Sequence, residues 1–568
     1  MKVKNLLSWF IFFLVNCVAL FSSEIPPSSQ KPENKALLEN STALFADPLF
    51  RRVFKELQNG EKGEFIYVAM DNFASGPLKI YTATDSAVLA AADFSRFPIP
   101  QELSALKELI KNRMEISPVF LRMYEKIKES RNIIFNLSES PSKKALLKTK
   151  ESGNKEFWKF PVIVFAKNPM KSFSALSELV PIGVSILNPV NGKATLRGSS
   201  FLAIMDEPLS IDNENLFSVK KSVEDYVFDL VVSFELAQTI LIETYGSEYF
   251  NLLNSNCFEK ALPWEITDRK RAFREGFSIA MQALCGVDRS TWYLIANPGY
   301  RIFGHLKNSE DYITRQIYFY TGDLNGKWGK NASQILSTSG IIASILLEIM
   351  KSQEIKYPFE KIVKTFLLEK PMDLISFIKG FEKNFPMDRA TIYRIFLEGT
   401  NCITADSQAY ECFNRLLTKK CELFSRKIFF PDYKKTEVEF SRLKEAIYER
   451  ALKNGRLIEN LGPELWFSAY SYTGSYSNGV YFPSFWNFDL NTADYHQFSD
   501  WRAMATEEII QFLEKRKRIG YFEENPILIL KKIFGENRFK DIAKKYRIEE
   551  GSIKNEIKFF NENYLLKK

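Results

Sequence analysis

Apolar residues recur at helical spacing near the middle of the chain, which predicts an amphipathic helix over residues 219–246. The apolar positions are Val219, Val223, Val227, Leu230, Phe234, Ala237 and Leu241. Short apolar runs at 161–165, 182–187 and 194–205 precede it and predict strands. Asn191-Gly192 lies between the last two runs and is typical of a two-residue hairpin turn. A small sheet is therefore expected ahead of this helix.

The N-terminal quarter of the chain mixes both kinds of pattern. Strand patterns occupy residues 65–70 and 78–82, and helical patterns occupy residues 47–57 and 101–116. Residues 138–155 are polar and rich in lysine, which indicates a boundary between domains.

Downstream of the central helix the pattern is mostly helical. Helical spacing runs over 268–350, where residues 335–350 form an apolar helix, and continues over 357–450 with breaks at prolines. Residues 462–485 are rich in Tyr, Ser, Gly and Phe and indicate strand or irregular structure. The predicted fold class is α+β, a mostly helical multidomain protein with a small sheet ahead of a helical core and a helical hairpin module at the C-terminus. The predicted divisions are a signal or anchor at 1–23, a tether at 24–45, an N-terminal α+β domain at 46–140, a core domain at 157–485 and a helical tail at 486–568.

The N-terminus has the pattern of an export signal. Two lysines, Lys2 and Lys4, precede a mostly apolar stretch at 6–21, and polar residues and prolines follow it. This stretch is shorter than the about 20 residues of a comfortable membrane span, and no clean small-x-small pair marks a cleavage site. A cleaved signal peptide and a membrane tether through residues 6–21 both remain open. Either way we expect an exported protein that is periplasmic, secreted or anchored on the outer face.

Composition narrows the chemistry that the chain can perform. The 568 residues include 77 basic and 69 acidic side chains, and the formal net charge of +8 neither requires nor excludes an anionic partner. Only two histidines occur, His305 and His496, so any histidine-based metal ligation or general-base catalysis would have to use one of them. Both lie far along the chain from the central helix.

Five cysteines follow the N-terminal stretch, and none forms a C-x-x-C pair. They are Cys257, Cys285, Cys402, Cys412 and Cys421. Outside the cytoplasm disulfides form, and the last three cysteines are close enough in sequence for one pair among them. The alternative is that they are small buried side chains with free thiols.

The segment Phe234-Glu235-Leu236-Ala237-Gln238 resembles the H-E-x-x-H helix of the Glu-type zinc metallopeptidases (gluzincins), with both histidines replaced. Further along, Arg274-Glu275-Gly276-Phe277-Ser278 resembles the family's second helix, whose glutamate is the third zinc ligand. The resemblance covers about residues 160–350. It implies that Phe234 and Gln238 stand at ligand positions, Glu235 at the general-base position and Glu275 at the third ligand position.

This degenerate motif lacks the groups that zinc hydrolysis needs. Phe234 has no ligand atom, and the amide oxygen of Gln238 is a poor match for the nitrogen and sulfur ligands that zinc prefers. We therefore expect no catalytic residue, no metal and no cofactor at these positions.

Two other interpretations of the motif remain open. The pentapeptide can be an ordinary helical stretch, with Phe234 on the buried stripe and Glu235 and Gln238 in water. Glu275 is then either a surface residue or a partner of Arg271 or Arg274. The third interpretation is a metal site with rearranged ligands from Glu235, Glu275 and His305.

Near the C-terminus, Phe488-Asp489-Leu490-Asn491-Thr492-Ala493-Asp494, followed by segments 505–510 and 518–522, resembles the helix-hairpin-helix module of competence-type DNA-binding proteins. The resemblance implies a first helix opened by Asn491-Thr492-Ala493, with Thr492 as the N-cap, and a second helix over 505–517. Residues 500–504 stand where the family has a glycine turn that holds a DNA phosphate, and they include no glycine. A further lysine-rich helix is expected over 537–564.

The candidate nucleic-acid contacts are four consecutive cations, Lys515, Arg516, Lys517 and Arg518. The alternative for such a run is a solvated helix end, where positive charge also suits the helix dipole.

These patterns predict an exported, non-catalytic binding or scaffold protein built on a degenerate peptidase-like core. An unidentified protein is the expected partner. The alternatives are an envelope DNA-binding protein acting through the C-terminal tail and a metallohydrolase with rearranged ligands.

Overall fold

The computed structural model describes residues 65–69, 79–83, 117–138, 162–166, 181–187, 194–205, 233–234, 236–241, 244–245, 248–253, 263–287, 316–319, 329–426, 431–477 and 480–548. This part of the chain is mostly helical with some strands, an α+β fold. The expected signal, tether and helices at 47–57 and 101–116 lie outside the described residues. Within those residues, no helix combines the length and the apolar character needed to cross a membrane.

The chain folds into two compact units, each assembled from separate stretches. The first comprises Met1–Asn254, Phe277–Tyr312 and Tyr357–Met372, and the second comprises Ser255–Gly276, Ile313–Lys356 and Asp373–Lys568. The core domain expected over 157–485 therefore contributes to both units.

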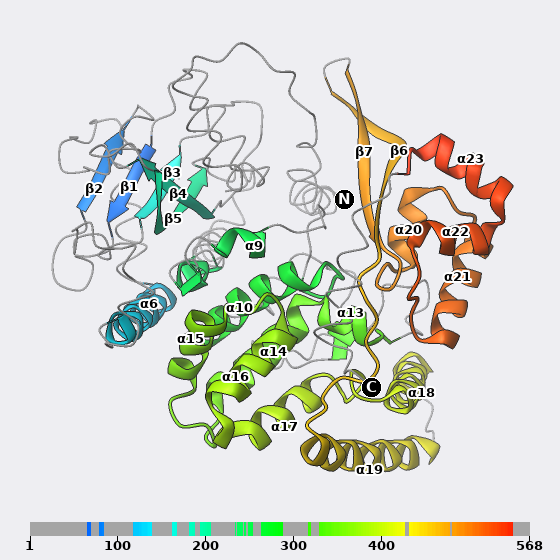
Figure 1. Cartoon of the computed structure of the whole chain (residues 1–568), viewed down its shortest axis with the longest axis horizontal. Coiled ribbons are helices and arrows are strands. Elements are labelled where there is room, and N and C mark those ends of the chain that lie inside the picture. Colours follow the sequence, from blue (N-terminus) through cyan, green and yellow to red (C-terminus); the bar gives the residue numbers. More distant parts are fainter. Residues whose placement is uncertain are drawn as a thin grey trace. The chain divides into compact units, whose positions relative to one another are not determined.

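The first unit contains a five-stranded sheet (Figure 1). Its strands are β1 (Phe65–Ala69), β2 (Lys79–Ala83), β3 (Val162–Ala166), β4 (Pro181–Leu187) and β5 (Ala194–Met205). The strand order is β2-β1-β3-β5-β4, and all neighbours are antiparallel except the parallel pair β3 and β5. The expected hairpin of β4 and β5 is confirmed, with Leu187 opposite Ala194. Asn191-Gly192 itself lies outside the described residues.

Helices of the first unit pack through aromatic rings. They are α6 (Pro118–Ser138), α9 (Tyr249–Leu253), α15 (Pro358–Glu369) and the last half of α10 (Arg269–Leu284). Pro358 opens α15 at a position where its missing N–H costs nothing. Phe366 of α15 packs edge-on against Phe277 of α10, with 5.0 Å between ring centroids, and Lys126 of α6 lies 4.6 Å from the ring centroid of Phe359.

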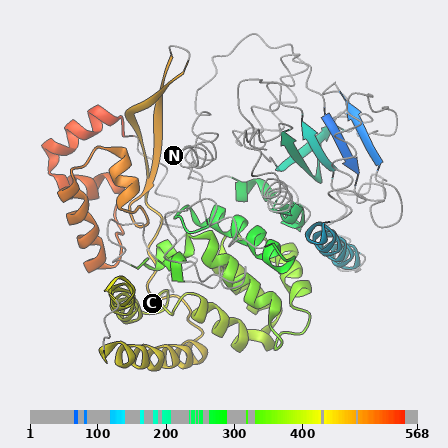
Figure 2. The ribbon, with the colours of Figure 1, turned by 180° about the vertical axis from the view of Figure 1, so that it is seen from behind.

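The second unit has a helical body formed mainly around α14. The body consists of residues 263–276, the 3-10 helices η10 (Gln316–Phe319) and η11 (Pro386–Asp388), and the helices α13 (Ala332–Leu336), α14 (Ser339–Lys351), α16 (Leu374–Asn384), α17 (Arg389–Gly399), α18 (Ser407–Arg426) and α19 (Pro431–Asn454). Nearly every side chain of α14 is buried, which explains its almost uniformly apolar sequence. Figure 2 shows α18 and α19 together at one end of this body.

Two glycines let neighbouring helices approach α14 closely. A Cβ on Gly276 of α10 would lie 2.7 Å from Ile342 Cγ2, and a Cβ on Gly399 of α17 would collide with Ile345 Cγ1. Glycine is therefore required at both crossings for steric reasons.

The apolar helix expected over 335–350 is divided in the structure. Helix α13 ends at Leu336 and α14 begins at Ser339, because Ser337 and Thr338 pair with an extended segment instead. The N–H of Thr267 donates to Ser337 O at 2.8 Å, and Ile266 forms an isolated antiparallel bridge with Thr338. The hydrophobic pattern continues through this break, so the sequence alone does not reveal it.

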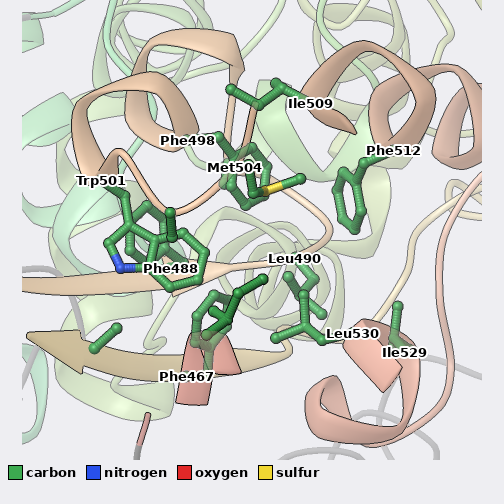
Figure 3. Packing of buried hydrophobic residues seen from close by; sticks show 14 of the residues in the cluster. Phe467, Phe488, Leu490, Phe498, Trp501, Met504, Ile509, Phe512, Ile529 and Leu530 are labelled. Carbon is green, nitrogen blue, oxygen red and sulfur yellow. The ribbon is translucent and has the colours of Figure 1, made fainter. Parts of the chain in front are cut away.

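Residues 465–548 form a C-terminal module with its own core. It contains the hairpin of β6 (Trp466–Ser477) and β7 (Val480–Asp489), followed by α20 (Tyr495–Trp501), α21 (Thr506–Ile519), α22 (Pro526–Phe534) and α23 (Glu536–Tyr546). Helices α20 and α21 form one helical hairpin, and α22 and α23 form a second beside it (Figure 1). The strands and all four helices contribute to one cluster of buried side chains (Figure 3).

Aromatic rings hold the strands and the first helical hairpin together. Phe488 of β7 stacks on Phe467 of β6 at 5.2 Å and on Phe498 of α20 at 5.7 Å between ring centroids. The fully buried Trp501 contacts Phe467 and Phe488. Trp501 lies in the stretch 500–504, where the family has its glycine turn, and here it ends α20 and belongs to the core.

The ends of α20 and α21 differ in detail from the prediction. The N-cap of α20 is Asp494, which accepts the N–H of Gln497 in a capping box, and not Thr492. Arg502 follows α20 with a φ of 57°, so a non-glycine residue adopts the left-handed conformation at the turn. Gly520 ends α21 with a φ of 85°.

Candidate functional site

The helix with the metallopeptidase-like motif uses its polar side chains for internal contacts. Gln238 is buried, and its Oε1 accepts a hydrogen bond from Tyr249 Oη at 2.6 Å. Ser233 Oγ accepts one from Gln282 Nε2 of α10 at 3.0 Å, so this helix lies against α10 in the first unit. Phe234 is half-buried, and Glu235 lies outside the described residues. The alternative that placed Gln238 in water is wrong, because a neighbouring tyrosine binds its oxygen.

Glu275 is an ion-pair partner on its own helix. It is buried, Arg271 Nε lies 2.7 Å from its Oε1, and an Arg274 nitrogen lies 4.0 Å from the same oxygen. The interpretation in which Glu275 pairs with these arginines is therefore confirmed.

The residues at the three zinc-ligand positions do not fit zinc. Phe234 carries no ligand atom, the oxygen of Gln238 accepts a hydrogen bond from a hydroxyl group, and the carboxylate of Glu275 is paired with a guanidinium. Among the described residues, no group of three or more His, Cys, Asp or Glu side chains is arranged to hold a metal ion. His305, proposed as a rearranged ligand, lies outside those residues.

Three of the cysteines are buried thiols. Cys285, Cys402 and Cys412 are free, and burial raises the pKa of both Cys285 and Cys402 to about 12. A high pKa keeps the thiol protonated and unreactive.

The four consecutive cations of α21 differ sharply in their surroundings. Lys515, Lys517 and Arg518 are exposed, whereas Arg516 is buried. Arg516 Nη1 donates to the carbonyl oxygens of Leu490 and Ala493, each at 2.8 Å, and burial lowers the pKa of Arg516 to about 10. Arg516 therefore binds the loop before α20 and does not belong to a basic surface.

This loop, residues 489–493, is held by many hydrogen bonds within the C-terminal module. Asp489 is buried and accepts bonds from the backbone N–H groups of Leu465 and Asn491 and from the hydroxyl of Thr492. Burial raises the pKa of Asp489, while these hydrogen bonds oppose the rise. Asn491 Nδ2 donates to the carbonyls of Pro463 and Phe522, and its Oδ1 accepts the N–H of Phe522. The residues that carried the helix-hairpin-helix resemblance thus hold the module together.

The helical body also donates hydrogen bonds to loop 489–493. Asn331 Nδ2 donates to Asn491 O at 3.2 Å, and Gln334 Nε2 donates to Thr492 O at 2.9 Å. Both side chains also form the capping box of α13. We call these contacts, together with loop 489–493, the junction.

A second set of contacts joins the body to the start of β6. Arg269 is buried, and its Nη2 donates to Gly462 O at 2.5 Å. Its backbone N–H donates to Glu464 Oε1 at 3.1 Å, and its Nε lies 3.8 Å from the same oxygen. The body therefore binds the chain both just before β6 and just after β7 through polar groups.

Sequence reasoning missed Lys330, the buried lysine next to the junction. Its Nζ donates to Trp264 O at 2.5 Å and to Thr338 Oγ1 at 3.0 Å, and burial lowers its pKa to about 7. The sequence carries no signal for it, because Gly329-Lys330-Asn331 has the composition of an exposed turn.

Comparisons with protein-family models, with curated proteins and with solved structures find no match to this chain.

We expect Arg516→Ala to destabilise the second unit by about 2–4 kcal/mol, because two buried carbonyls lose a charged donor. Lys515→Ala and Lys517→Ala, exposed neighbours on the same helix, should change the free energy of unfolding by no more than about 0.5 kcal/mol. Denaturant unfolding followed by circular dichroism measures the difference. Equal losses in all three variants would show that the assignment of Arg516 to the interior is wrong.

Proposed function

We propose that this chain is an exported, non-catalytic binding or scaffold protein with an unidentified protein partner. The observation that carries the proposal is that Gln238, Glu275 and Arg516, three of the polar residues at predicted chemical positions, are buried and bonded inside the fold. Gln238 accepts a bond from Tyr249, Glu275 pairs with Arg271, and Arg516 binds two carbonyls. Groups held in this way stabilise the protein and are not available to activate a water molecule or a substrate.

The same contacts support a peptidase-like ancestry for the core. The helix that contains Phe234 and Gln238 lies against α10, which carries Glu275, and a sheet precedes both in the chain. A sheet ahead of the motif helix is the order of elements in the gluzincin family, which the motif resembles. We propose that the scaffold was kept while the metal-binding residues were replaced.

Metal analysis and a peptidase assay test the non-catalytic part of the proposal. The purified chain, dialysed against zinc and then against buffer, should hold far less than one zinc per molecule by inductively coupled plasma analysis. It should not cleave an unfolded protein substrate. Glu275→Gln and Gln238→Ala should leave both results unchanged. One bound zinc per chain that disappears in these two variants would contradict the proposal.

Export rests on the N-terminal pattern, a basic start followed by an apolar stretch and a polar, proline-containing segment. A reporter enzyme that is active only outside the cytoplasm, fused after residue 45, should be active in cells. Leu14→Asp with Val15→Asp interrupts the apolar stretch and should abolish that activity. Full activity in this double variant, or no activity in the parent fusion, would refute export by residues 1–23.

DNA binding by the C-terminal module is a second candidate function. The observation that favours it is the turn between α22 and α23, where Gly535 has a φ of 79° and no atom lies within 4 Å of the position of an added Cβ. An open glycine turn between two helices permits the close backbone approach to phosphate that the turn at Arg502 does not offer. The exposed Lys515, Lys517 and Arg518 add positive charge to the same module.

Salt-dependent binding of the full chain to duplex DNA tests this candidate. Replacing Lys515, Lys517 and Arg518 by alanine should weaken binding and reduce the slope of log K against log salt by about 0.9 for each phosphate that is no longer neutralised. Replacing three exposed cations of α19, Lys434, Lys435 and Arg442, removes the same charge and serves as the control. Absence of binding at low salt, or equal effects of the two triple changes, would exclude this function.

A further inference from the structure

Lys330 is enclosed in the second unit, and no carboxylate of the described residues accepts a hydrogen bond from it. Its side chain is fully buried, and both acceptors of its Nζ, Trp264 O and Thr338 Oγ1, are neutral. Thr338 Oγ1 itself donates to Gln334 O at 2.7 Å. Lys330 therefore donates to Thr338, and Thr338 donates to Gln334. Gln334 is one of the two residues whose side chains bind the junction loop.

The titratable groups that act on Lys330 or contact its neighbour Gly329 come from three segments. Glu265 of segment 263–268 and Asp494, the N-cap of α20, favour the charged form of Lys330 electrostatically, although burial has the larger effect. Tyr410 of α18 donates to Gly329 O at 3.2 Å, and burial raises the pKa of Tyr410. Asp494 also interacts with Arg516, so one carboxylate is shared by the lysine and the arginine on the two sides of the junction.

The short segment 329–334 connects the lysine to the C-terminal module. The backbone N–H of Lys330 donates to Phe319 O, and the next residue, Asn331, donates to Asn491 O in the module. Gln334, one turn further, donates to Thr492 O. Because the lysine and both donors to the loop lie in this one segment, a displacement of the segment that hydrates Lys330 also breaks the two bonds to the loop.

We infer that the junction is a proton-sensitive latch between the helical body and the C-terminal module, in which opening hydrates Lys330 and allows it to take up a proton. The closed latch keeps the amine among neutral acceptors, where a charge is costly. The open latch returns the amine to water, where it is an ordinary cation.

The direction of the pH dependence follows from the two protonation equilibria. In the closed state the pKa of Lys330 is about 7, and in the hydrated state it returns toward 10.5. Between these values the open state binds more protons than the closed state, so the free energy of opening rises with pH. Below about pH 7 both states are protonated, and Lys330 adds no further pH dependence. The latch is therefore weakest at neutral and acidic pH and tightens toward alkaline pH.

Native-state hydrogen exchange of the full chain tests the latch. The backbone N–H groups of Lys330, Asn331 and Gln334 report on it, because all three are hydrogen-bonded and lie in the segment that opening displaces. After correction for intrinsic exchange, their protection should rise by up to about tenfold per pH unit between pH 7 and pH 10. Amides in the middle of α17, away from the junction, should show a smaller rise.

Lys330→Met removes the titrating group and should abolish most of the rise at the junction amides, while raising their protection at pH 7. Lys383→Met, which replaces an exposed lysine of α16, is the control and should behave as the parent chain. An unchanged slope in Lys330→Met would overturn the inference. If this variant does not fold, the parent chain decides alone, because equal pH slopes at the junction and in α17 would also overturn it.

Discussion

The second unit depends on the buried hydrogen bonds around loop 489–493. A loop of this kind carries backbone polar groups that must find partners once water is excluded, since each unpaired one costs about 1–3 kcal/mol. Here the partners come from three parts of the second unit. Asp489 and Asn491 bind backbone groups of the module itself, Arg516 approaches from α21, and Asn331 and Gln334 approach from the body. The position of the β6–β7 hairpin relative to the body follows from satisfying these groups together.

Two basic side chains, Arg516 and Lys330, are buried in the same region, and their surroundings differ. Arg516 remains a cation because two carbonyl oxygens accept its bonds and Asp489 and Asp494 are near. Lys330 has only neutral acceptors, so burial lowers its pKa to about 7. A guanidinium tolerates burial better than an ammonium because its charge is delocalised and less strongly hydrated. The lysine is consequently the group in the described interior that is poised to respond to proton concentration.

The two resemblances in the sequence have a common structural explanation. In both cases, polar residues that would perform chemistry in the family are held by neighbours in this chain, as Gln238 is by Tyr249 and Arg516 by the loop carbonyls. The proposed binding or scaffold role rests on these contacts, since a well-packed framework can present surfaces without a reactive centre.

The sequence by itself determined the elements whose pattern is local. It predicted the strands of the first sheet, the β4–β5 hairpin and the second helix of the tail, because these depend on residues close together in the chain. Even the burial of Arg516 has a local signal, since Ile509, Phe512 and Leu513 place position 516 on the buried stripe. Only the tertiary structure decided the break between α13 and α14, which comes from pairing with residues 266–267, and the environment of Lys330. Lys330 is buried by residues distant in sequence, such as Trp264 and Asp494. A contact of this kind leaves no periodic pattern in the sequence.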